Sequence, residues 1–459
     1  MRRRLFASAA FSVACSAAFA IAADPLPLPI PPAARPSLRT LEKTGQEKTE
    51  PKSTPVVPPP RTPGEPAPRA TDTPTPTIES HSEMPSMPGS QSICDDHLGP
   101  WNTVWARGGY NYLWIRQAPA SVPLLTSNGT ILAGNTQTDY GAFSGGSVDA
   151  GVWFDRRHTL GIGASGFLAE KRGTGSSFTS DALGNPAFTR PFYNAQIGGT
   201  DGADGFIVSA PGRFTGSFAY EQGARVAGFD VFGLKNVVNN ETWTANFSVG
   251  FRYFDLDEYA TTYQVTQSLN GSNIPFFGGT VNGVSITDRI RTRNQLFGGQ
   301  FGGDVEYRLG AVFLDLGAKA ALGPVHQITE VQGVTEATGG SSGPGGFLAV
   351  GNVPNGNQGR ISTNNFAVLA DANALVGVQI SSHFRIGFGY QFLYLNNVAR
   401  PSAQFVSAID PRLIPTSVSY NGRTPSSTAN GGPGTPPNSP YDRDDFFLHG
   451  LRFTVELQY

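Results

Sequence analysis

The last fifteen residues of the chain read Asp445-Phe446-Phe447-Leu448-His449-Gly450-Leu451-Arg452-Phe453-Thr454-Val455-Glu456-Leu457-Gln458-Tyr459. From Phe447 onward every second residue is apolar, with His449 as the exception. The intervening residues are polar at the last four positions, from Arg452 to Gln458. A period of two predicts a β-strand with one apolar and one polar face. This segment alone does not distinguish a strand of a membrane barrel from an edge strand of a soluble β-sandwich.

The composition suits sheet and long loops and argues against several other classes. The 459 residues include 56 Gly and 36 Pro, 15% are charged, and the net charge is -2. A nearly neutral chain predicts no nucleic-acid partner. Beyond the N-terminus we find no segment typical of a transmembrane helix. A chain that spans a membrane would therefore do so as a closed barrel, which pairs every backbone group without helices.

The N-terminus has the features of an export signal. Three arginines, Arg2–Arg4, precede an apolar run from Leu5 to about Ala20, and small residues follow. This order predicts a signal peptide over residues 1–22, because the run is short for a membrane anchor.

Residues 23–100 have a different composition, dominated by Pro, Thr, Ser, Lys and Glu. Such a segment cannot bury enough apolar surface to fold, so we expect a disordered periplasmic tail. One interpretation is that the tail makes contacts in the periplasm or with the cell wall. The other is that it has no partner. After signal cleavage Cys94 is the sole thiol, which excludes an internal disulfide.

The two-residue alternation persists from Val104 to the C-terminus. The strands that it predicts are 104–114, 147–154, 160–171, 213–235, 243–263, 294–308, 312–322, 366–380, 384–394 and 447–459. The long loops expected between them are 117–144, 173–212, 268–287, 334–360 and 398–444.

Long loops alternate with short turns throughout this series, which is typical of outer-membrane barrels. We therefore predict an all-β fold over residues 101–459. It is an antiparallel, transmembrane up-and-down barrel of about ten strands, or twelve if either long segment is split. An even number of strands places the first and the last strand's chain ends on the periplasmic side. Outer-membrane lipid is the expected partner.

Residues 213–235 keep one phase throughout, so we predict one long strand there. Its even-numbered side is expected to face lipid, with Asp230 as an exception. The residues assigned to this side are Phe214, Phe218, Tyr220, Ala224, Val226, Phe232 and Leu234.

Several short motifs occur in a fixed order: Tyr112–Trp114 with Pro123–Thr126, Phe143–Gly146, Arg190–Asn194, Gly250–Glu258 and Asn294–Gln300. In this order and spacing, the chain from residue 103 to 459 resembles the putative beta-barrel porin family seven of bacterial outer membranes. The resemblance implies an outer-membrane location. The family's porin label names no solute and supplies no site residue.

The strand pattern turns charged side chains of both signs toward the interior. The predicted lumen-lining residues are Arg107, Asp149, Lys171, Arg225, Arg252, Glu258, Asp304, Glu306, Arg308, Asp315, Lys319, Asp371, Arg385, Arg452 and Glu456. They form either a polar conduit for small solutes or a salt-bridged plug. Ten strands lie near the size at which side chains fill a barrel. The sequence thus predicts a porin or narrow channel, or alternatively a structural or adhesive surface barrel that acts through its long loops.

An enzyme is the rival class, and the sequence argues against it. Outer-membrane proteases and lipases need a Ser/His or Asp/His constellation, and no G-x-S-x-G stretch marks a nucleophile. The histidines of the mature chain are His81, His97, His158, His326, His383 and His449, of which His326 is the one candidate base. Asp139, Asp201 and Asp204 match no calcium loop. We predict no catalytic residue, cofactor or metal site.

Overall fold

The computed structural model describes residues 103–116, 118–119, 122–135, 137–195, 202–351, 356–420 and 442–459. The predicted signal peptide, the Pro-rich tail, Cys94, His81, His97 and Asp201 lie outside these residues. Among the described residues, no helix is both long enough and apolar enough to cross a membrane.

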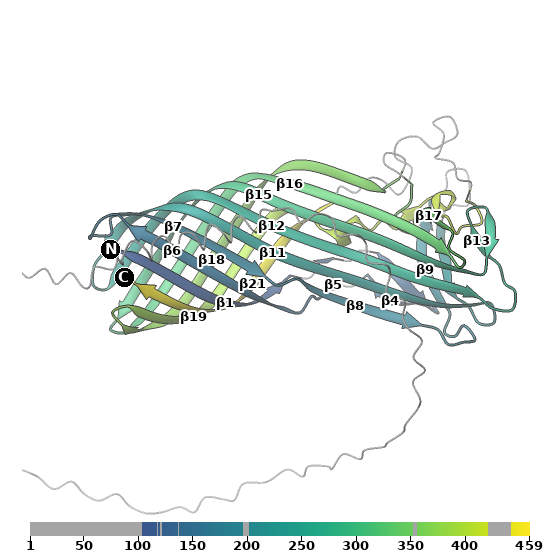
Figure 1. The fold of residues 1–459 in the computed structure, drawn as a ribbon, viewed down its shortest axis with the longest axis horizontal. Helices are drawn as coiled ribbons and strands as arrows, with labels where there is room; N and C mark the ends of the chain where they lie inside the picture. Colours follow the sequence, from purple (N-terminus) through teal and green to yellow (C-terminus); the bar gives the residue numbers. More distant parts are fainter. Residues whose placement is uncertain are drawn as a thin grey trace, which may run out of the picture. The chain divides into compact units, whose positions relative to one another are not determined.

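Ten antiparallel strands form a closed ring (Figure 1). In ring order they are β12 (Trp243–Ser268), β15 (Gly283–Leu309), β16 (Val312–Ala337), β18 (Gly359–Ser381), β19 (Phe384–Ala399), β21 (Arg443–Gln458), β1 (Val104–Ile115), β6 (Ala142–Trp153), β7 (Leu160–Ala169) and β11 (Phe214–Asn239). Pairing of β11 with β12 closes the ring.

The first and last strands meet in the wall of the barrel. β1 pairs with β21 over its whole length, and Val104 and Tyr459 exchange two backbone hydrogen bonds of 2.7 Å. The predicted up-and-down barrel of about ten strands is confirmed. The single long strand over 213–235 is confirmed as β11, and the alternation of short turns with long connections is also present.

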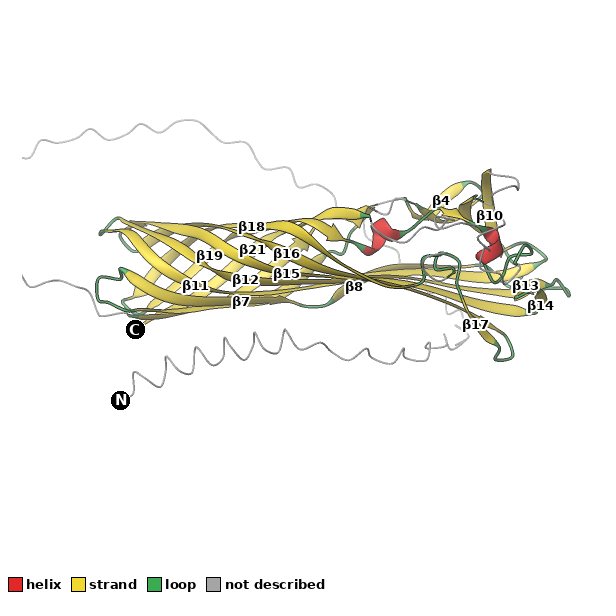
Figure 2. Ribbon diagram, turned by 90° about the horizontal axis from the view of Figure 1, so that it is seen from above, coloured by secondary structure: helices red, strands yellow, loops and turns green. Residues whose placement is uncertain are grey.

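The strands differ greatly in length. β11, β12 and β16 have 26 residues and β15 has 27, whereas β1 and β6 have 12 and β7 has 10. A tilted strand needs about ten residues to cross a bilayer. The long strands are therefore more than twice as long as a bilayer crossing requires, and they continue as a curved sheet, which Figure 2 shows to the right of the ring. β8 (Arg172–Thr179) pairs with β11 in this extension, and β17 (Ser342–Pro344) pairs with β16.

A band of exposed apolar side chains surrounds the shorter part of the barrel. All ten ring strands contribute to it, as the following outward residues show: Tyr110, Val148, Leu160, Leu168, Val231, Val249, Phe251, Phe297, Phe301, Leu314, Leu316, Val376, Val378, Phe388, Tyr390, Leu451 and Phe453. An apolar band of this kind faces lipid in outer-membrane barrels.

A second, smaller sheet lies over the inner face of the extension (Figure 2). It consists of β10 (Gly202–Ser209), β9 (Phe188–Asn194), β3 (Pro123–Ser127) and β4 (Thr130–Gly134), with β20 (Ala408–Ile409) beside β9. The remaining short elements are β2 (Ala118–Pro119), β5 (Gln137–Thr138), β13 (Ile274–Phe276), β14 (Gly279–Val281) and the 3-10 turns η1 (Pro401–Gln404) and η2 (Pro411–Leu413).

The small sheet and the extension enclose a hydrophobic core. Leu125 of β3, Phe188 of β9 and Val208 of β10 pack with Phe218 of β11 and Ile286 of β15, and each is at most 3% exposed. We call this two-layered part the head. It stands on the barrel at the end that carries the long connections.

The predicted faces of β11 are reversed in the structure. Its even-numbered residues, from Phe214 to Leu234, are buried inside, and the odd-numbered residues point outward. Two causes explain the error. The outward face of the extension meets water and is therefore polar, and the inward face packs into the core of the head. Asp230 is consequently no exception, because it points into the lumen.

This arrangement predicts a labelling pattern on β11. In a Cys94→Ser background, Thr215→Cys will react with a membrane-impermeant maleimide on intact cells, whereas Phe218→Cys will not, because Phe218 is 1% exposed. Mass spectrometry of the purified chain measures the labelling. Reaction at position 218 with protection at 215 would restore the sequence-based face assignment.

Candidate functional site

The lumen of the barrel holds a group of charged side chains of both signs. At the short-turn end, Arg107 of β1 pairs with Glu456 of β21 at 2.6 Å. Arg107 also reaches Asp315 of β16 at 3.4 Å, across three intervening strands of the ring. Arg385 of β19 spans to Glu306 of β15 at 2.9 Å. The bond to Glu456 joins neighbouring strands, whereas the bonds to Asp315 and Glu306 cross the lumen.

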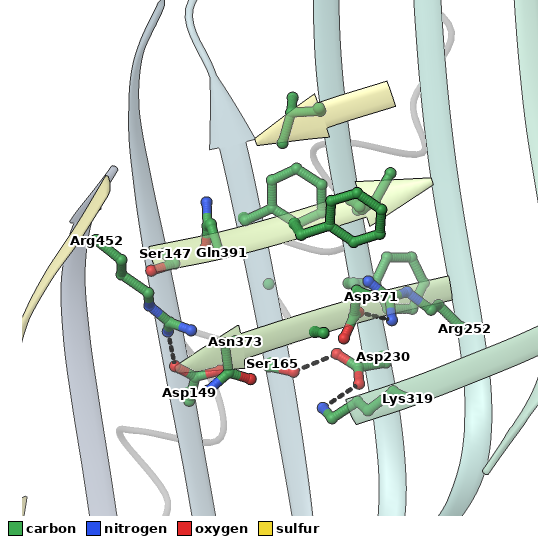
Figure 3. A pocket seen from close by; sticks show the side chains of 18 residues that line it. Ser147, Asp149, Ser165, Asp230, Arg252, Lys319, Asp371, Asn373, Gln391 and Arg452 are labelled. Atoms are coloured by element: carbon green, nitrogen blue, oxygen red, sulfur yellow. Dashed lines mark hydrogen bonds and ion pairs between the residues drawn. The ribbon is translucent and has the colours of Figure 1, made fainter. Parts of the chain in front are cut away.

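A second polar layer lies deeper in the barrel (Figure 3). Asp230 of β11 accepts from Lys319 of β16 at 2.9 Å and from Ser165. Arg252 of β12 pairs with Asp371 of β18, and Arg452 of β21 pairs with Asp149 of β6 at 2.5 Å. Each charge in this layer therefore has a partner of opposite sign.

Two cavities lie between these side chains of the described residues. The larger, about 270 Å³, lies at the short-turn end and is lined by residues such as Trp105, Arg107 and Glu306. The smaller, about 110 Å³, lies beside the Asp230 layer, and Phe167, Leu393 and Leu448 also border it. We call the two cavities together the vestibule.

An apolar layer lies across the lumen above the vestibule. Every ring strand contributes inward residues to it: Leu113, Phe143, Ala169, Ala224, Val226, Phe254, Leu256, Leu296, Ala321, Val325, Ala367, Leu369, Leu393, Leu395, Phe446 and Leu448. None of them is more than 5% exposed. We call this cluster the lumen layer.

A ring contact shows that the lumen layer is continuous across the barrel. Phe254 of β12 and Phe446 of β21 lie with their ring centroids 6.0 Å apart. Four strands separate β12 from β21 in either direction around the ring, so these rings meet from opposite walls. Phe167 of β7 packs against Phe254 from a third direction at 6.2 Å.

A buried ion pair lies directly above the lumen layer. Arg400, after β19, binds both carboxylate oxygens of Glu258, at 2.7 and 3.2 Å, and both residues are at most 1% exposed. The Tyr140 hydroxyl donates to Glu258 at 3.4 Å. Burial raises the pKa of Tyr140 well above its ordinary value, and the charge of Glu258 raises it further. Together these residues tie two long connections to the barrel wall.

A second buried ion pair anchors the head. Arg190 of β9 reaches Asp288 of β15 at 3.3 Å, and its guanidinium lies 4.1 Å from the ring centroid of Phe347. The other oxygen of Asp288 accepts three backbone N–H groups, from Phe347, Leu348 and Ala349, at 2.8 to 2.9 Å. One carboxylate thus holds both the small sheet and the connection between β16 and β18.

The structure brings most of the predicted lumen residues together. The vestibule is lined by Arg107, Asp149, Arg252, Asp304, Glu306, Arg308, Asp315, Lys319, Asp371, Arg385, Arg452 and Glu456. Glu258 points inward as predicted but lies above the lumen layer.

Lys171 and Arg225 differ from the prediction, because both lie on the outer face. β7 and β8 both pair with β11, and Leu168 lies opposite Ala227 while Arg172 lies opposite Ala224. From Leu168 to Arg172 the chain advances by four residues, while β11 advances by three from Ala227 to Ala224. This one-residue bulge turns Lys171 outward. Arg225 is on the outward face of β11, whose phase the sequence assigned incorrectly.

Four functional candidates were missed from the sequence. The sequence pattern treats Asp230 as an exception on a lipid-facing side, because it assigns the wrong face to this strand. Arg190, Asp288 and Arg400 lie in or next to segments that the sequence predicts to be loops. The motif around Arg190 was a usable signal, since a charged residue within an ordered loop motif needs a buried partner.

His326 lies on the outward face of β16. Its Nδ1 bonds Asn364 at 2.7 Å, and its Nε2 lies 3.3 Å from the Ser362 hydroxyl. Asn364 and Ser362 are exposed on β18, and none of the three residues lines a cavity described above.

Comparison with known proteins agrees with this architecture. Residues 117–459 match the family model described as "Putative beta barrel porin-7". The chain belongs to this family. It is an outer-membrane β-barrel, as the ring and its apolar band indicate. No curated protein matches the chain in sequence.

Solved outer-membrane barrels share the fold only distantly. The outer membrane protease OmpT from Escherichia coli is 10% identical, covering 78% of this chain and 97% of its own, with a TM-score of 0.34. The P. putida toluene transporter TodX is 8% identical, covering 79% of this chain and 91% of its own, with a TM-score of 0.21. Likenesses this low say nothing about activity.

The Glu258–Arg400 pair generates a stability prediction. Glu258→Leu leaves a buried guanidinium without its closest carboxylate, with Asp444 4.0 Å away as the remaining one, and we expect it to destabilise the protein by about 3–5 kcal/mol. The double variant Glu258→Leu/Arg400→Leu removes both charges and will recover much of that loss. Urea unfolding in detergent micelles measures these two variants and the single variant Arg400→Leu. A double variant as unstable as the sum of the single variants would show that the two residues do not act as a pair.

Proposed function

We propose that this protein is a barrel anchor that displays the head at the cell surface, and that its lumen is closed at rest. The lumen layer is the observation that carries the proposal. Inward apolar residues from all ten strands meet across the barrel, at most 5% exposed. This reading develops the structural or adhesive alternative, because the head is built from the long connections.

The energetics of the lumen layer favour a stable closure. Emptying the space of one buried Phe side chain costs about 3–5 kcal/mol. A polar solute that entered the layer would lose its hydration without gaining hydrogen bonds, at a cost of roughly 2–7 kcal/mol per polar group. Steady conduction therefore requires the layer to rearrange.

A porin or narrow channel for small solutes is the second candidate function. The vestibule favours it, because a polar cavity of about 270 Å³ lined by both charge signs suits small solutes. The description of the family also favours it. In this reading the lumen layer is the gate, and Phe254 and Phe446 are its opposing sides.

Export and tail contacts complete the proposal. A signal peptide over residues 1–22 accounts for delivery to the outer membrane, and the Pro-rich segment 23–100 suits a periplasmic tether that contacts the cell wall. Both rest on composition and residue order.

We infer that the protein is not an enzyme, although Ser362, His326 and Asn364 are hydrogen-bonded in the order of a hydrolytic triad. The three side chains lie on an open strand face rather than in a pocket that excludes water. A serine there lacks the enclosed, preorganised surroundings that stabilise a transition-state charge.

Conductance tests the closed lumen. Purified full-length protein in planar bilayers will show no single-channel steps above the lipid background, because the lumen layer excludes ions. Phe254→Gly/Phe446→Gly removes both rings and will produce steps. The matched control is Phe388→Gly/Phe453→Gly, a cross-strand pair that faces lipid. Steady steps from the unaltered protein would favour the channel reading instead.

A reactive-serine probe tests the inference against hydrolysis. A fluorophosphonate will label the folded protein no more than it labels the Ser362→Ala variant. In-gel fluorescence measures the difference. Labelling that Ser362→Ala and His326→Ala both abolish would identify an activated nucleophile and overturn the inference.

A further inference from the structure

Lys171 and Arg225, which the sequence pattern assigned to the lumen, lie on the outer face of the barrel just above the apolar band. Leu168, 46% exposed, is the last apolar residue that β7 turns outward. Lys171 follows three residues later, and because the bulge fits four residues into three positions, it lies about 7 Å further along the strand. With the strand tilt of roughly 40° this is a rise of about 6 Å. The polar headgroup zone beyond the hydrocarbon is about 5–7 Å deep, so Lys171 stands at its upper edge.

Neighbouring carboxylates are already engaged by other groups. Asp257, opposite Arg225 on β12, is held by Arg291 through bonds of 2.9 and 2.7 Å. Asp255 is held by Arg293 at 3.0 Å. Within the described part of the chain, neither Lys171 nor Arg225 forms an ion pair.

An aromatic ring supports the cationic site. The Lys171 ammonium lies 4.7 Å from the ring centroid of Tyr259, and the guanidinium of Arg289 lies 6.0 Å from it. The Tyr259 hydroxyl donates to Glu221 at 2.8 Å. A Cβ on Gly223 would come within 2.5 Å of the Tyr259 ring, so the ring lies flat over β11 because residue 223 is glycine.

The remaining charged neighbours do not cancel these cations. Glu170 and Arg172 lie 3.9 Å apart and balance each other. Glu221 offsets the charge of Arg289. The outer face around Tyr259 therefore retains the two positive charges of Lys171 and Arg225. The charges on this part of the outer wall therefore sum to a positive site beside the lipid-facing surface.

We propose that Lys171 and Arg225, with Tyr259 as a platform, bind the phosphate group of an outer-leaflet lipid. Phosphate is the anion that lipids carry at this height, and Arg and Lys are its usual partners. The position favours a lipid over free phosphate, because the acyl chains of a bound lipid lie along the exposed apolar residues Leu168 and Val231. The site is independent of whether the lumen opens.

Thermal unfolding of the full-length protein in maltoside micelles tests the site. The probe is dioleoyl phosphatidic acid, titrated into the micelles, with inorganic phosphate and oleate in parallel. Phosphatidic acid will raise the unfolding midpoint, and inorganic phosphate and oleate will not. Lys171→Gln/Arg225→Gln will weaken the apparent affinity roughly thirtyfold, since each cation near a membrane surface contributes about a fivefold gain in binding.

The matched control is Arg157→Gln/Lys235→Gln, which removes two exposed cations at the short-turn end. It will respond to phosphatidic acid as the unaltered protein does. If the Lys171/Arg225 double variant does not fold, as judged by heat-modifiable gel mobility, the two single variants replace it. Full retention of the effect in these variants overturns the proposal. An equal effect of inorganic phosphate overturns the lipid assignment, and an equal effect of oleate overturns the assignment to phosphate.

Discussion

A ten-stranded ring is too narrow to hydrate many charged side chains, so each inward residue needs a partner or an apolar neighbour. The lumen satisfies this constraint in layers. Arg107 and Arg385 bind carboxylates across the short-turn end, and the layer around Asp230 repeats the arrangement with different strands. The lumen layer needs no charges because apolar side chains fill it from all sides. The closed lumen that we propose is a consequence of filling a narrow ring.

The same strands serve two environments along their length. Within the bilayer, apolar residues such as Phe251 and Phe297 point outward and charged residues point inward. Beyond it, the pattern inverts: Thr215 and Ser217 point outward into water, while Phe218 and Ile286 point into the core of the head. Continuous backbone pairing allows this inversion, because the side-chain phase is kept while the surroundings change. In the function that we propose, this inversion lets one sheet act as both membrane anchor and surface scaffold.

Much of the fold followed from alternation alone. Strand type, the ring of about ten and the order of turns depend on local period, which the sequence displays directly. The errors occurred where a face is decided by distant contacts. Lys171 was placed in the lumen because a one-residue bulge leaves no local signal, and the face of β11 was reversed because the head that covers it is built from loops. Asp288 was missed for a related reason, since its partners are backbone groups more than fifty residues away.

The central claim is that opposite walls of the barrel meet in the lumen layer. Fluorine-labelled phenylalanine at positions 254 and 446, in protein reconstituted into bilayers, tests it most directly through the ¹⁹F–¹⁹F dipolar coupling. With ring centroids 6.0 Å apart, the account predicts a clear coupling in the resting protein. Rings that show no coupling, with both fluorines exposed to a paramagnetic ion in water, would mean an open lumen and would contradict the account.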